Sequence, residues 1–232
     1  MCALLAASTV TSDAQIGPLP PIPAPPPSAP DPVEKLSDTL FRFGVMRVDT
    51  AKREVTIPGK MNATMQLEFI ANTKNGFRAY ESAFELEANG LTFNLAMILL
   101  GLDKKNSVLP KFHFDPTPPV GDPVEVWVEW KTGNGTKRVR AEDLLWDKER
   151  KQHFQRSGWV YTGSALLDDG RYLADLDAVL IGFVHDPASI IEWTGSSGVG
   201  RFGFIEVDPK LGLAPGTAIT VIVKATGKRA QQ

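Results

Sequence analysis

Hydrophobic and polar residues alternate along this chain with two different periods, which predict two kinds of element. In residues 124–130 (VEVWVEW) valine takes alternate positions, as in a strand with one buried face. Turn-forming residues at 132–135 (TGNG) and a second short strand at 136–140 complete a predicted hairpin. Around residues 91–100 the apolar residues instead recur every three or four positions, which predicts a helix.

The predicted helix is expected to be the main buried helix of the molecule. Asn89 or Thr92 can cap its start, and Gly101 is placed to end it. Two apolar stripes lie side by side on it, one made of Leu91, Leu95, Ile98, Leu99 and Leu102 and the other of Phe93, Met97 and Leu100. Truncation to alanine is expected to cost ~2–5 kcal/mol at each of the three side chains predicted to be buried, Leu95, Ile98 and Leu99.

Short apolar runs bounded by turn residues predict strands through the rest of the chain. A hairpin is expected from 44–48 and 54–57, with Pro58 and Gly59 ending its second strand. Further strands are predicted at 65–71, 159–165, 171–174, 178–184, 190–193, 202–207 and 218–223. The fold class that follows is α+β, a β-rich single domain of about ten short, mainly antiparallel strands with one main buried helix. We expect this domain to span 36–226, with a disordered tail at 227–232.

The first 35 residues differ in composition from the rest of the chain. Residues 1–14 contain an apolar run and end with the small residues Ser12 and Ala14, at the positions that signal peptidase reads. They predict a signal peptide, truncated because a positively charged start is missing; an uncleaved apolar N-terminus is the alternative. Residues 17–33 hold nine of the 18 prolines, which disfavour helix and interior strand. Residues 15–35 are therefore predicted to be a disordered tether.

Leader and tether together predict an extracytoplasmic protein, secreted or periplasmic, with attachment to the cell envelope as a further option. The formal charge of −2 and the pI near 6.0 give no basic surface for nucleic acid or an anionic membrane. Cys2 is the only cysteine, so the chain after the leader has no disulfide, thiolate metal site or cysteine nucleophile. Beyond residue 14 no stretch has the about 20 continuous apolar residues that span a bilayer.

Several short motifs occur in a fixed order along the chain. They are 49–59 (DTAKREVTIPG), 80–82 (YES) before the apolar helix, the strand 124–128 (VEVWV), 159–164 (WVYTGS) and 215–217 (PGT). In this order they resemble the YdjY domain family over nearly all of residues 43–224. The resemblance implies a bacterial, often secreted or envelope-linked domain with no activity to transfer. Members commonly carry a histidine before the Glu-Ser pair, where this chain has Tyr80, and some carry redox-linked cysteines that this chain lacks. Histidine chemistry at that position and redox function are therefore not carried over.

The best candidate site is Tyr80, Glu81 and Ser82, because it places a carboxylate and a hydroxyl at the start of a strand. Ser82 lies outside any Gly-x-Ser-x-Gly motif, so a nucleophilic role is disfavoured; satisfying backbone groups at a strand edge is the simpler interpretation. Glu81 with Asp177 or Glu192 could supply the paired carboxylates of a glycoside hydrolase.

Two tryptophans are candidate binding residues. Trp127 and Trp159 alternate with polar residues in predicted strands, so either could face solvent and stack on a sugar or a partner side chain; ordinary packing is the alternative. The most suitable metal ligands are 185–186 (His-Asp) with Asp175 and Asp177, but they lack any known ligand spacing. We expect no metal and no cofactor.

These observations favour a non-enzymatic binding or assembly module of the cell envelope, whose partner is an unknown envelope protein or glycan. The alternative is an extracytoplasmic hydrolase that uses acidic residues around Glu81. A pocket that brings Glu81 within reach of a second acid would favour the hydrolase. The candidate binding residues are Tyr80, Glu81, Ser82, Trp127 and Trp159.

Overall fold

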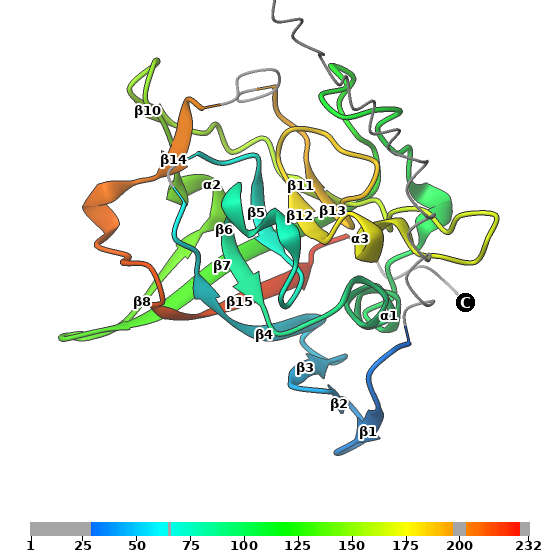
Figure 1. Ribbon diagram of the computed structural model, residues 1–232. Coiled ribbons are helices and arrows are strands. Elements are labelled where there is room, and N and C mark those ends of the chain that lie inside the picture. Colours follow the sequence, from blue (N-terminus) through cyan, green and yellow to red (C-terminus); the bar gives the residue numbers. More distant parts are fainter. Residues whose placement is uncertain (1–28, 65, 197–202, 228–232) are drawn as a thin grey trace, which may run out of the picture.

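Eight strands of the chain close into a β-barrel, because the last strand of a curved sheet pairs with its first (Figure 1). The computed structural model describes residues 29–64, 66–196 and 203–227. In order around the barrel the strands are β4 (Glu54–Met61), β15 (Ala218–Ala225), β7 (Asp122–Thr132), β11 (Trp159–Tyr161), β13 (Ile191–Trp193), β12 (Val179–Gly182), β5 (Phe69–Asn72) and β6 (Ser82–Leu86). The pairs β12–β13 and β5–β6 are parallel and the others are antiparallel.

The remaining elements are attached to this barrel. On β4 the sheet continues through β3 (Met46–Asp49), β2 (Leu40–Phe43) and β1 (Val33–Lys35), and β7 also pairs with β8 (Gly135–Arg140). A small separate sheet contains β10 (Gln152–His153), β9 (Leu145–Asp147) and β14 (Ile205–Val207). The helical elements are α1 (Gly90–Leu99), α2 (Ala141–Leu144), α3 (Leu173–Leu176) and the 3-10 turns η1 (Phe77–Tyr80), η2 (Lys104–Asn106) and η3 (Pro209–Leu211). The predicted β-rich character is confirmed, whereas the closed barrel and the additional short strands were not predicted.

The alternating pattern of 124–130 forms the inner lining of the barrel at β7. Val124, Val126 and Val128 are buried, and Val126 and Val128 lie opposite Val223 and Val221 of β15. The predicted hairpin at 124–140 is confirmed by the pairing of β7 with β8. Because every buried position of β7 is apolar, the strand has one register that buries its valines.

Barrel closure explains why β4 does not end at Pro58 and Gly59, as the sequence predicted. The pairing of β4 with β3 stops at Thr56, and its pairing with β6 starts at Gly59. Pro58, which has no N–H to donate, therefore lies where β4 exchanges one neighbour for another. Gly59 lies so close to β6 that a Cβ would be 2.5 Å from the Glu85 carbonyl oxygen.

Helix α1 has the predicted caps but a different buried face. The Thr92 N–H donates to Asn89 Oδ1 at 2.7 Å, and Gly101 has a φ of +83°. The buried side chains include Phe93, Met97 and Leu100, which form the second apolar stripe, and Ala96 beside them. The prediction that Leu95, Ile98 and Leu99 are buried is wrong, because Ile98 is 48% exposed and Leu95 and Leu99 are only half-buried.

The rotation of α1 follows from contacts at its N-terminus. Asp175 of α3 accepts hydrogen bonds from the N–H groups of Gly90 and Leu91, at 2.5 and 3.2 Å. Gly90 lies so close to Ala174 that a Cβ would come within 2.9 Å of the Ala174 Cβ. This contact with α3 turns Phe93 and Met97 inward.

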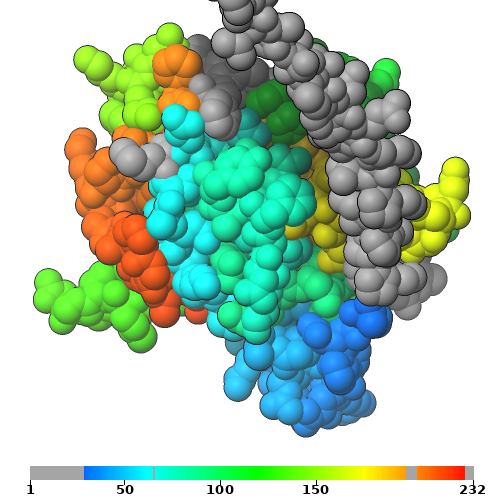
Figure 2. All heavy atoms as spheres, viewed as in Figure 1, coloured from blue at the N-terminus to red at the C-terminus, as the bar shows by residue number. Residues whose placement is uncertain are grey.

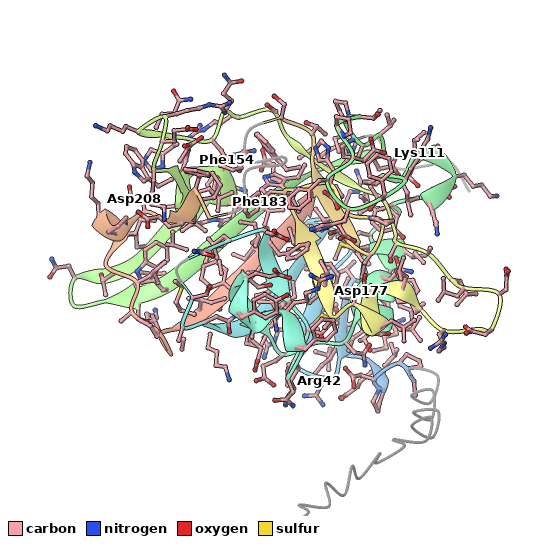
Figure 3. All side chains as sticks on the ribbon, turned by 45° about the horizontal axis from the view of Figure 1, so that its top comes forward. Arg42, Lys111, Phe154, Asp177, Phe183 and Asp208 are labelled. Atoms are coloured by element: carbon pink, nitrogen blue, oxygen red, sulfur yellow. The ribbon has the colours of Figure 1, made fainter. Side chains whose placement is uncertain are left out.

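One predicted strand is largely absent. Residues 171–174 contribute only an isolated bridge at Tyr172, and α3 begins at the next residue. The small sheet packs on the barrel through Phe154, whose ring centroid lies 5.3 Å from that of Phe183 and 4.7 Å from that of Trp193 (Figure 3).

Among the described residues no helix has the length and apolar character needed to cross a membrane. The predicted leader, most of the predicted tether and most of the predicted tail lie outside the described residues.

Candidate functional site

The structure separates the three residues of the Tyr80-Glu81-Ser82 motif by exposure. Tyr80 ends η1 and is 59% exposed, whereas Glu81 and Ser82 are buried where the chain enters β6. In the space-filling view the segments of β5, η1 and β6 (cyan to teal) form one continuous part of the visible face (Figure 2). Because Glu81 and Ser82 are buried, Tyr80 is the one residue of this motif whose side chain is directed to solvent.

Glu81 is bound by Arg78 of the same turn. Arg78 Nη1 donates to Glu81 Oε1 at 2.5 Å, and the guanidinium carbon lies 5.5 and 5.4 Å from the ring centroids of Phe69 and Phe77. Burial disfavours the Arg78 charge, but the hydrogen bond and charge of Glu81, with the charge of Asp177, outweigh it and raise the pKa of Arg78. Arg78 therefore stays cationic and keeps Glu81 paired.

A histidine clamp that the sequence did not predict lies next to this pair. His113 Nδ1 is 2.5 Å from Asp186 Oδ2, and its Nε2 is 3.0 Å from Glu68 Oε2. Hydrogen bonds to Asp186 and then to Glu68 raise the pKa of His113 to about 9, against the effect of burial. At neutral pH the ring is therefore an imidazolium that donates from both nitrogens, and it has no free nitrogen to act as a base.

The loop that carries His113 is fixed at its ends and near its centre. Val108 and Val120 exchange two backbone hydrogen bonds, of 2.9 and 3.2 Å, which close the loop. Farther along, the Phe114 N–H donates to the His185 carbonyl at 3.1 Å, and His185 Nδ1 lies 2.7 Å from the Asp115 carbonyl. Segment 108–120 is thus held against the chain that follows β12.

The carboxylates proposed from the sequence do gather around this clamp. Glu192 is fully buried, and its Oε1 accepts from the Asp186 N–H at 2.8 Å; burial raises the pKa of Glu192 to about 8, so the group is largely protonated at neutral pH. The backbone N–H of Glu68 donates to the Glu81 carbonyl at 2.9 Å. We call Glu68, Glu81, Asp177, Asp186 and Glu192 the acidic cluster.

Asp177 is the half-buried member of the acidic cluster. It follows α3 directly, at the point where the yellow ribbon passes into β12 (Figure 3). Burial and the charge of Asp186 raise the pKa of Asp177, while the charges of Arg78 and His113 oppose that shift. The side chain of Asp177 forms no hydrogen bond or ion pair with the described residues, in contrast to Glu81.

Ser82 is not arranged as a nucleophile. Its side chain is fully buried, and its hydroxyl has no hydrogen-bond partner in the described part of the chain. The Ser82 carbonyl accepts from Asn62 Nδ2 at 2.9 Å, and the same amide group donates to Asn72 Oδ1 at 2.8 Å. Because no base contacts the hydroxyl among these residues, the serine lacks the partner that nucleophilic catalysis needs.

The two candidate tryptophans differ from the prediction and from each other. Trp159 is 1% exposed and lies opposite Trp193 inside the barrel, so the prediction that it faces solvent is wrong; its strand is buried throughout. Trp127 is half-buried, and its ring centroid lies 4.8 and 5.2 Å from the guanidinium carbons of Arg138 and Arg140. The binding role of Trp127 stays a prediction. Its ring already contacts Arg138 and Arg140 of the same protein.

Of the residues considered as metal ligands, all but Asp177 have side-chain contacts with other groups. Asp175 binds the N-terminus of α1, and His185 contacts backbone carbonyls. In the ranges that the structure describes, no group of three or more histidine, cysteine, aspartate or glutamate side chains is arranged to hold a metal ion.

One cavity lies beside the N-terminus of α1 and not at the acidic cluster. It has a volume of about 490 Å³, and its lining includes Asp31, Lys74, Glu87 and Asp175. No member of the acidic cluster lines it. The cavity therefore does not bring Glu81 together with a second acid.

Most of the chain matches one protein family. A family model described as the YdjY domain matches residues 46–224. The chain belongs to the YdjY domain family. This confirms the resemblance, and the matched part of the YdjY domain contains η1, the acidic cluster and His113. No curated protein and no solved structure matches the chain.

Proposed function

We propose that this YdjY domain is a non-enzymatic, extracytoplasmic binding module that contacts an envelope protein or glycan through η1. The observation that carries the proposal is the exposure of two aromatic side chains, Phe77 and Tyr80, each 59% exposed. Residues three positions apart lie on the same side of a 3-10 helix, so the two rings share one surface. Large aromatic side chains exposed together are typical of interaction sites.

The turn that carries these rings is held by several bonds. Gly76 donates to the Thr73 carbonyl, Ala79 to Gly76 and Glu81 to Arg78, at 2.9, 3.3 and 3.1 Å. The Thr64 hydroxyl donates to the Tyr80 carbonyl at 2.5 Å. A binding surface that is already ordered loses little conformational entropy when a partner docks.

The pairing within the acidic cluster supports binding over hydrolysis. Glycoside hydrolysis needs one acid that donates a proton and a second carboxylate, both facing the substrate. Here Glu81 is paired with Arg78, His113 binds both Glu68 and Asp186, and Glu192 is fully buried. These contacts leave Asp177 as the member of the cluster that substrate could reach.

Sedimentation with isolated cell-wall sacculi and with envelope proteins tests the proposal. The full chain should sediment with one of these fractions, and a variant with Phe77→Ala and Tyr80→Ala should lose about 10-fold or more in affinity. Leu166→Ala is the matched control, because Leu166 is also largely exposed but lies outside η1. Release of soluble sugar fragments from the sacculi, abolished by Glu81→Gln, would instead support the hydrolase.

A further inference from the structure

The start of η1, which carries the aromatic pair, packs on the segment that contains Asp177. Gly76, which precedes η1, packs so closely on Ala178 that a Cβ would lie 2.7 Å from the Ala178 Cβ. The Thr73 N–H donates to the Ala178 carbonyl at 3.1 Å. Asp177 directly precedes Ala178 and acts on the charge of Arg78 in η1. We call Phe77, Tyr80 and Asp177 the η1 surface, and the Arg78–Glu81 pair lies beside it.

Negative charge is in excess at and beneath the η1 surface. Counted formally, the four carboxyl groups of Glu68, Glu81, Asp177 and Asp186 face the two cations Arg78 and His113, which leaves a formal charge of −2. Glu192 adds nothing at neutral pH, because burial raises its pKa to about 8. A half-buried carboxylate without a partner is unfavourable, so Asp177 gains when a cation approaches it.

The protein already shows at this surface how a cation is held. The Arg78 guanidinium lies over the Phe77 ring, with its carbon 5.4 Å from the centroid, and pairs with Glu81. A cation over an aromatic face next to a carboxylate gains from both contacts. The exposed Tyr80 ring and the half-buried Asp177 carboxylate are the aromatic and the acidic group that remain for a second cation.

We infer that the η1 surface binds an arginine or lysine side chain of a partner protein, with the cation over the Tyr80 ring and paired with Asp177. The inference rests on the proposed binding function and names the partner class that the function left open. A neutral glycan could stack on the rings but would leave the Asp177 charge uncompensated. The charge of the surface therefore favours a basic protein segment over a glycan.

An arginine peptide tests the inference directly. Acetyl-Gly-Arg-Gly-amide is titrated into the full chain and followed by the amide NMR signals of 77–82 and 177–178. A peptide with citrulline in place of arginine is the matched neutral ligand, and we expect it to bind about 10-fold more weakly. Binding of the arginine peptide should also weaken as salt is added. Absence of saturable shifts, or equal binding of both peptides, would overturn the inference.

Single variants of the surface provide the second measurement. Asp177→Asn and Tyr80→Ala should each weaken the arginine peptide about fivefold or more. Asp169→Asn should leave the affinity unchanged, because this exposed carboxylate lies in the turn before α3 and pairs with Arg171. If Asp177→Asn does not fold, the variant with Phe77→Ala and Tyr80→Ala replaces it, and unchanged affinity of that variant for the arginine peptide would overturn the inference.

A glycan and the proposed function have distinguishable outcomes. Shifts of the η1 signals by chitotetraose, with none from the arginine peptide, would reject the basic partner and keep the binding module. The basic partner would also be rejected, and the binding module kept, if sedimentation with the envelope fractions were lost in Phe77→Ala with Tyr80→Ala but unchanged in Asp177→Asn. Loss of sedimentation in every variant, including Leu166→Ala, would count against the proposed function instead.

Discussion

His113 holds a positive charge between two carboxylates that solvent hardly reaches. His113→Gln removes the charge and leaves Glu68 and Asp186 without their common partner, which costs about 3–5 kcal/mol when a pair is fully buried. The imidazole is 34% exposed, so we expect the free energy of unfolding to fall by about 2–3 kcal/mol. Urea denaturation at neutral pH measures this change.

A second histidine provides the control for this variant. His153 Nε2 also lies near a carboxylate, 3.3 Å from Asp208, but it is more exposed than His113. His153→Gln should therefore cost less than about 1 kcal/mol. Equal losses for the two variants would show that His113 does not act as a buried clamp.

Single residues of the site were only partly predictable from the sequence. Glu81, Asp177 and Glu192 were recognised as candidate acids, but Glu68 and His113 were not placed with them. The two bonds of His113 join residues that are 73 and 45 positions apart. No local pattern of residue types indicates which acid meets which histidine over such separations, because Glu68 and Asp186 come together through the pairing of β5 with β12.

At the scale of elements, α1 shows how a correct helix can have an incorrect buried face. Both apolar stripes have helical spacing, so periodicity alone does not choose between them. Contact with α3 makes that choice, and it buries Met97 while leaving Ile98 48% exposed. The position and caps of the helix were predictable because they depend on neighbouring residues, whereas its rotation depends on a distant one.

Alanine variants of α1 test this rotation. Met97→Ala removes a fully buried side chain and should lower the free energy of unfolding by about 2–5 kcal/mol. Ile98→Ala should cost less than about 1 kcal/mol, because nearly half of that side chain is already in water. Thermal or urea unfolding of the two variants measures the difference, and a larger loss for Ile98→Ala would contradict the observed face.

The junction of β4 and β6 gives a second prediction for a single element. Gly59→Ala places a Cβ 2.5 Å from a backbone oxygen of β6, and neither strand can yield without opening the barrel. We expect a loss of about 3 kcal/mol or more in the free energy of unfolding. Gly133→Ala is the control, since a Cβ there meets nothing within 4 Å, and its unfolding should match that of the original chain.

At the scale of the whole molecule, the half-buried His113 and the buried Glu192 make stability depend on pH in the same direction. The pKa of His113 is raised from 6.5 to about 9, and that of Glu192 from 4.5 to about 8. The folded state therefore binds more protons than the unfolded state between these values. Each contribution is complete below the unfolded pKa and is lost as pH rises through the folded pKa.

The free energy of unfolding should consequently fall as pH rises from about 5 to about 9. Urea denaturation across this range measures the slope. Glu192→Gln keeps the shape of the side chain without its ionisation, so it should flatten the slope between about pH 5 and about pH 8. A stability that rises over the same range would contradict the pairing of His113 and the burial of Glu192.

The location of the whole chain is tested by its mature N-terminus. Expression of the full reading frame in a bacterial host, followed by N-terminal sequencing, should give Gln15 in the extracytoplasmic fraction. The reason is the pair of small residues, Ser12 and Ala14, before the predicted cleavage point. Recovery of an intact Met1 in the cytoplasmic fraction would contradict the predicted export.

The β-rich class of the fold was predictable from the sequence, but the pairing of strands that are distant in sequence was not. Hairpins such as β3–β4 and β7–β8 join neighbouring segments, and turn residues indicate them. The pairings β4–β15, β5–β12 and β7–β11 join segments that are distant in sequence, with no local signal of order. A strand count therefore gave a β-rich domain, and closure of its sheet became visible only in three dimensions.

The position of β15 between β4 and β7 has a consequence for how the protein is made. β15 pairs with seven residues of each neighbour, yet of the eight barrel strands it is the last to leave the ribosome. Until it emerges, β4 and β7 have unpaired edges of the kind that attract other chains. Nascent chains should thus remain open to chaperones until synthesis of residues 218–225, and a stalled chain that lacks them should aggregate.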